Sequence, residues 1–97
     1  MIKKIKINSK TYNIEQFKEC DWSSTPMGLC QPDQSKIFCD PKQELQQQAD
    51  TIIHECIHVI SDNFNLELDE RQTRALAVSL YGIIVDNPNF INCIMEK

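Results

Sequence analysis

Two histidines and one glutamate form the pattern with the clearest chemical meaning in this sequence. His54, Glu55 and His58 make a His-Glu-x-x-His motif, and the chain contains no other histidine. Side chains four residues apart leave the same face of a helix, so both imidazoles could bind one divalent metal ion. Glu55 would lie about 100° further round the helix, within reach of water at the metal without being a ligand.

The residues around the motif indicate a buried amphipathic helix. Apolar side chains recur there with helical spacing, at Ala49, Ile52, Ile53, Cys56, Ile57, Ile60 and Phe64. This pattern predicts a metal helix over about residues 42–62. The alternative interpretation is an amphipathic helix whose histidines only line the edge of the core.

A complete metal site needs a further ligand. Catalytic zinc usually takes three protein ligands and leaves one position for water or substrate. Because no third histidine exists, acidic residues near the next predicted helix are the candidates: Asp62, Glu67, Asp69 and Glu70. Spacing alone does not choose between them, since acidic residues at a helix start are also favoured by the helix dipole.

The motif resembles the metal helix of the zincin metallopeptidases. The β-rich start, the segment 28–40, the metal helix and a second helix that opens at Leu68, Asp69 and Glu70 and stops at Pro88 extend this likeness. Together they resemble small phage- or prophage-encoded proteins of the zincin type, related to the ImmA/IrrE group.

This resemblance implies a specific site and activity. Glu70, twelve residues after His58, would be the third ligand of one zinc ion. Glu55 would be the general base of peptide-bond hydrolysis. The strand Ile37 to Asp40 would offer a free edge along which a peptide substrate could lie.

The sequence does not offer every group that a metallopeptidase site needs. A metallopeptidase needs a donor for the oxyanion, and no additional histidine can serve. Tyr81 lies eleven residues beyond Glu70, about 16 Å along one helix, which is too far. Arg74 is expected to pair with Glu70. The alternative function is therefore a non-catalytic, zinc-stabilised module that binds another protein.

Composition limits the other function classes. The net charge is −4 and no basic run occurs, which argues against a nucleic-acid groove. No apolar stretch is long enough to span a membrane, and the basic start is not followed by the apolar region of a signal peptide. Five cysteines without a Cys-x-x-Cys pair favour reduced thiols in the cytoplasm. The oligomeric state stays open.

The predicted architecture is a single α+β domain over residues 1–97, of a minimal zincin-like kind. Three or four short strands, within about residues 2–40, form a small antiparallel sheet. The sheet packs on the metal helix and on a second long helix at about 67–86, and a short helix follows at about 88–95. Ile5 and Ile7, which alternate with lysines, mark the first strand of a hairpin that turns at Asn8-Ser9-Lys10. A second hairpin turns at residues 32–35, and its antiparallel pairing sets Cys30 opposite Ile37.

Overall fold

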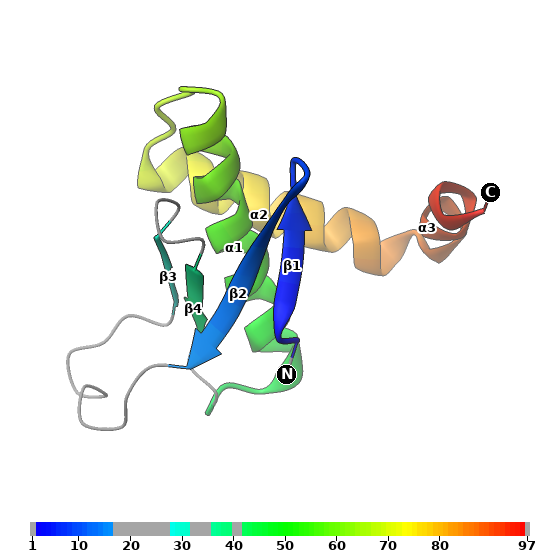
Figure 1. Cartoon of the computed structure of the whole chain (residues 1–97). Helices are drawn as coiled ribbons and strands as arrows, with labels where there is room; N and C mark the ends of the chain where they lie inside the picture. The colour runs from blue at the N-terminus through cyan, green and yellow to red at the C-terminus, as the bar shows by residue number, and fades with distance from the viewer. Residues whose placement is uncertain (1, 17–27, 32–35, 40–41, 97) are drawn as a thin grey trace.

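The computed structural model describes residues 2–16, 28–31, 36–39 and 42–96. It confirms the α+β class: one small sheet is followed by three helices. Figure 1 shows the first helix lying across the sheet, and the second helix crossing the first and running beyond it. None of the helices formed by the described residues has the length and apolar character needed to cross a membrane.

The sheet begins with the predicted hairpin. Strand β1 (Lys4–Ile7) pairs antiparallel with β2 (Lys10–Gln16), so that Ile5 lies opposite Tyr12. Asn8 and Ser9 connect the strands with φ angles of 51° and 71°. Two consecutive left-handed residues are typical of the tight turn whose twist matches that of a hairpin, and Asn adopts this conformation more readily than most residues.

The second hairpin also has the predicted register. Strand β3 (Gly28–Gln31) pairs antiparallel with β4 (Lys36–Cys39), and Cys30 lies opposite Ile37. However, β2 and β4 run parallel, with Ile14 beside Ile37. The expectation of a wholly antiparallel sheet is therefore corrected to a mixed sheet. Local sequence fixes the register of a hairpin but not the direction in which two hairpins meet.

The strand order β1-β2-β4-β3 overturns the expected role of the Ile37 strand as a free edge. β4 pairs on both sides, and β3 is the outer strand at this end of the sheet. Asp40 lies outside the described residues. Both edge strands contact the first helix, and β3 does so more extensively than β1.

Helix α1 (Leu45–Asn63) covers the sheet and completes the core. Its Ile52 and Val59 pack against five buried sheet residues: Ile7, Tyr12, Ile14, Ile37 and Cys39. Fully burying one such aliphatic side chain contributes about 1.5–3 kcal/mol. The helix starts at Leu45 rather than near 42, because the chain is still extended at Glu44 and the preceding Gln43 is engaged by Thr51 and Gln48.

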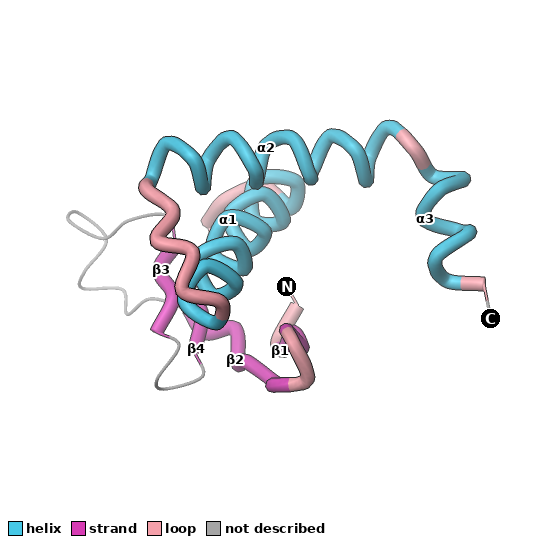
Figure 2. Tube along the Cα trace, turned by 90° about the horizontal axis from the view of Figure 1, so that it is seen from above, coloured by secondary structure: helices cyan, strands magenta, loops and turns pink. Residues whose placement is uncertain are grey.

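Helix α2 (Glu70–Asp86) crosses α1, and α3 (Pro88–Met95) turns away from its far end (Figure 2). α3 has the predicted bounds. α2 begins three residues later than the predicted 67, because Glu67 has a left-handed φ of 55° and Asp69 is the residue that caps the helix. Only Thr73 and Ala77 of α2, and no residue of α3, are buried.

Candidate metal centre

Helix α1 places both histidines side by side, as the motif predicts. The ring centroids of His54 and His58 are 4.9 Å apart, with their planes inclined at 67°. Their side chains are 19% and 26% exposed. Both imidazole rings are therefore accessible from solvent, while the backbone of α1 fixes the spacing between them.

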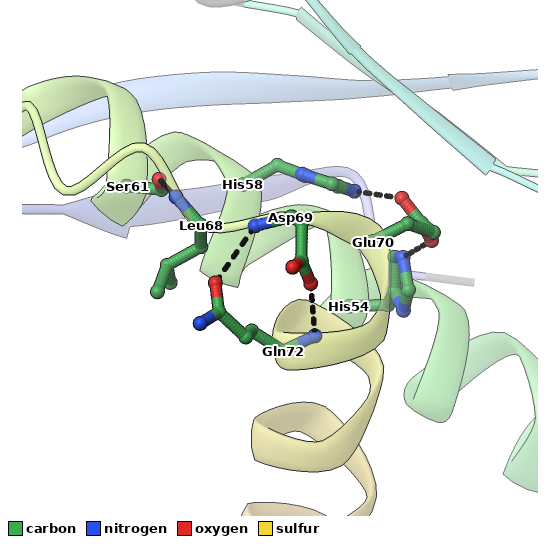
Figure 3. A network of polar contacts seen from close by, with 7 residues as sticks. All are labelled: His54, His58, Ser61, Leu68, Asp69, Glu70 and Gln72. Atoms are coloured by element: carbon green, nitrogen blue, oxygen red, sulfur yellow. Dashed lines mark hydrogen bonds and ion pairs between the residues drawn. The ribbon is translucent and has the colours of Figure 1, made fainter.

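Glu70 is the acidic residue that meets the two histidines. Its Oε1 lies 2.6 Å from Nε2 of His54, and its Oε2 lies 3.2 Å from Nε2 of His58. Figure 3 shows the carboxylate at the start of α2 facing both rings on α1. As the first residue of α2, Glu70 also lies at the positive end of the helix dipole, which favours its negative charge.

The three competing acids are placed differently. Asp69 is used to cap α2: its Oδ1 accepts a hydrogen bond of 2.7 Å from the backbone N–H of Gln72. Asp62 and Glu67 are exposed. Within the described part of the chain, no ion pair joins either of them to a histidine, and the expected Arg74–Glu70 pair does not form either.

A short network holds Glu70 in place. Ser61, one turn after His58, accepts two hydrogen bonds from the loop between the helices. Its carbonyl oxygen takes the N–H of Leu66 at 2.9 Å, and its Oγ takes the N–H of Leu68 at 3.1 Å. The capping box of Asp69 and Gln72 then fixes the first turn of α2 (Figure 3). The loop is thereby tied to the same helix that carries the histidines.

Glu55 occupies a different environment from Glu70. It is 6% exposed, whereas the side chain of Glu70 is 57% exposed. Ligand atoms of His54, Glu55 and His58 all lie within 4.8 Å of one another. Two carboxylates therefore border the histidine pair: Glu70 in direct contact with both Nε2 atoms, and Glu55 within the range that a bridging water molecule could span.

The residues fit a zinc ion. Bonds of 2.0–2.2 Å to nitrogen and oxygen in a tetrahedral arrangement set neighbouring ligand atoms about 3.3–3.6 Å apart. The two contacts of Glu70, at 2.6 and 3.2 Å, need only small adjustments to reach that spacing. Two imidazole nitrogens and one carboxylate oxygen are also a donor set that zinc uses in catalytic sites.

Cys56 belongs to the core and not to the group of candidate metal ligands. Burial, together with the negative charge of the neighbouring Glu55, raises the pKa of its thiol to about 11. At neutral pH the thiol therefore stays protonated, while zinc binds the thiolate form. Cys56 packs against the core of the sheet and α1, as its position two residues after His54 predicts.

The sequence reasoning missed Ser61. A serine near the end of a helix has no distinctive spacing, and its role depends on where the loop returns in space. Ser61 is 9% exposed and lies three residues after His58. A small buried polar residue one turn from a metal ligand, directly before a loop, is the signal that could have drawn attention to it.

No family model matches the chain, and no curated protein or solved structure shows significant similarity to it. The functional argument therefore depends on the geometry of the residues themselves. The structure establishes that a His54, Glu55 and His58 group of suitable size for a metal ion exists on α1, with Glu70 in contact with both histidines.

Proposed function

We propose that this chain is a zinc-dependent metallopeptidase of minimal size. The observation that carries the proposal is the single carboxylate of Glu70, which contacts Nε2 of both His54 and His58 from another helix. An isolated helix with two histidines would need no such partner. In the proposed site, His54, His58 and Glu70 hold one zinc ion.

Glu55 is the proposed general base. A bound zinc ion supplies Lewis-acid chemistry, polarising a carbonyl oxygen and acidifying water. Glu55 accepts the proton of the attacking water molecule and delivers it to the nitrogen of the leaving amine. Its burial next to the two histidines supports this role, because it holds the carboxylate beside the site at which the water molecule would be activated.

The substrate we propose is an extended peptide segment of a protein. β3 is the edge strand beside α1, and its outer backbone groups can pair with a peptide by strand addition. This role, first expected for the Ile37 strand, passes to β3. We place the activity in the cytoplasm, because Cys56 and Cys93 are free thiols, as is usual in a reducing compartment.

The decisive test combines metal content with activity. We expect close to one zinc ion per chain in protein purified without added metal, and a clear loss of zinc in Glu70→Ala. Zinc-loaded wild type should cleave members of a peptide library that Glu55→Gln, with the same zinc content, leaves intact. Equal activity in the two proteins would reject the proposed base. A zinc content unchanged by Glu70→Ala would reject the proposed third ligand.

A non-catalytic zinc-stabilised module is the second candidate, and one observation favours it. Only two residues of α2 are buried, so a metal bound by α1 and α2 would stabilise a helix that buries little of its own surface. Such a module would lose structure on chelation and bind its partner equally well as Glu55→Gln. Stability that is independent of metal, in a protein that binds zinc, would exclude this alternative.

A further inference from the structure

The part of α2 from Leu76 onward and all of α3 carry an apolar surface that nothing in the described structure covers. Seven large apolar side chains on it are between 39% and 71% exposed: Leu76, Leu80, Ile83, Ile84, Phe90, Ile94 and Met95. We call these seven residues the apolar arm. Figures 1 and 2 both show this part of α2, with α3 at its end, extending beyond α1 and the sheet.

The four residues of the apolar arm that belong to α2 share one side of that helix. Leu76, Leu80 and Ile83 follow the 4–3 spacing of a helix seam, and Ile84 extends the same face. This face is continuous with Thr73 and Ala77, the two residues that are buried in the first half of the helix. α2 therefore carries one long packing face, of which α1 covers only the beginning.

The exposed area matches what a stable dimer requires. A large side chain that is half exposed presents on the order of 100 Å², so the seven residues expose roughly 700 Å². Monomeric soluble proteins rarely expose a contiguous apolar patch beyond about 300–600 Å². A standard-size interface buries about 800 Å² on each partner. The apolar arm thus offers nearly one full side of such an interface.

The near absence of charge on the apolar arm indicates which class of partner can bind it. Between residues 75 and 95, Asp86 is the only charged side chain. Binding to an anionic membrane surface uses lysine and arginine, and this segment has neither. A charged protein partner would find no complementary group. A second copy of the same surface is neutral and apolar, and because the arm extends away from the sheet, two copies can approach without their bodies colliding.

We propose that the apolar arm pairs with the apolar arm of a second copy of this chain, forming a twofold-symmetric dimer through α2 and α3. In such an interface the same patch serves on both subunits. The dimer places the two metal centres at the outer ends of the paired arms, near the start of each α2. The inference does not depend on the metal or on peptidase activity.

The test is the mass of the full chain in solution, measured by sedimentation equilibrium over a range of concentrations. Wild type should show twice the chain mass of 11.3 kDa. Ile83→Glu should raise the dissociation constant at least about thirty-fold, the loss of a central interface contact. Val78→Glu is the matched control, because Val78 is 58% exposed but lies on the opposite face of α2. It should leave the dimer unchanged.

A second variant separates a weakened interface from a misfolded chain. Phe90→Glu changes α3, in which no residue is buried, so it should keep the helical circular dichroism of wild type while weakening the dimer. A wild type that stays monomeric at about 100 μM, a hundredfold above a 1 μM dissociation constant, overturns the proposal, whether or not it pellets with vesicles or captures another protein. A dimer that Ile83→Glu and Phe90→Glu leave intact also overturns it.

Discussion

Helices α1 and α2 are similar in length but differ in how the protein uses them. α1 has seven buried residues spread along its length, whereas α2 has two, both in its first half. Both helices contribute to the candidate metal centre: two histidines come from the packed helix, and one carboxylate comes from the start of the exposed helix. Core packing therefore fixes the histidines, while hydrogen bonds of the connecting loop fix Glu70.

The difference between the packed helix and the exposed helix should have its largest effect on zinc affinity. Structural zinc sites bind their metal with a free energy of about 10–16 kcal/mol. Shared over four ligands, this is about 3–4 kcal/mol for each ligand, which corresponds to roughly a hundredfold to a thousandfold in zinc affinity. We expect His58→Ala to lower zinc affinity by about a thousandfold and Glu70→Ala by about a hundredfold. The exposed position of Glu70 allows water to replace its carboxylate. Competition with a chromophoric chelator measures both, and an equal loss would contradict the ranking.

The second contrast compares the same substitution on the two helices. Ile52 of α1 is 4% exposed and Ile83 of α2 is 47% exposed. Ile52→Ala should lower the free energy of unfolding by about 2–5 kcal/mol, because it leaves a cavity in the core. Ile83→Ala should change it by less than about 0.5 kcal/mol. Urea unfolding, at a chain concentration where wild type is monomeric, measures both. Comparable losses would mean that α2 is covered within one chain.

Sequence reasoning predicted the features that depend on local spacing. The period of apolar residues located α1 and most of α2, Pro88 located the start of α3, and the alternation of Ile5 and Ile7 with lysines located β1. The antiparallel pairing of both hairpins was also predicted, including the Cys30–Ile37 register. The motif also placed the two histidines correctly, since the helix geometry leaves little choice.

Features that depend on distant parts of the chain were not predictable in this way. The parallel pairing of β2 with β4 joins two hairpins whose sequences carry no record of their relative direction. The sequence alone left four acids as possible partners of the histidines, and the preference for Glu70 came from the resemblance to zincins. The loop conformation at Asn65 and Glu67, which brings Glu70 back to α1, has no simple sequence signal.

The role of that loop gives the third prediction. Ser61→Ala removes the Oγ that accepts the N–H of Leu68, so the loop and Glu70 become less fixed relative to the histidines. Zinc affinity should fall about tenfold, the lower end of the effect of losing a group that orients a ligand. Ser79→Ala, on the exposed surface of α2, is the matched control and should bind zinc like wild type. Unchanged affinity in Ser61→Ala would show that burial, rather than the loop, fixes Glu70.

The smallest expected effect tests whether α2 depends on its cap more than on packing. Asp69→Ala removes the side chain that accepts the Gln72 N–H, and should cost about 1 kcal/mol of folding stability. Asp86→Ala is the control at the other end of the same helix, where a carboxylate opposes the dipole, so its removal should be neutral or stabilise by about 0.3–1 kcal/mol. Thermal unfolding of the zinc-free protein separates this effect from metal binding. Opposite signs for the two aspartates would establish that the ends of α2, which packing leaves largely uncovered, set its stability. A loss of stability in both variants would instead indicate that Asp86 makes a stabilising contact, and the interface of the proposed dimer would be the next region to test for it.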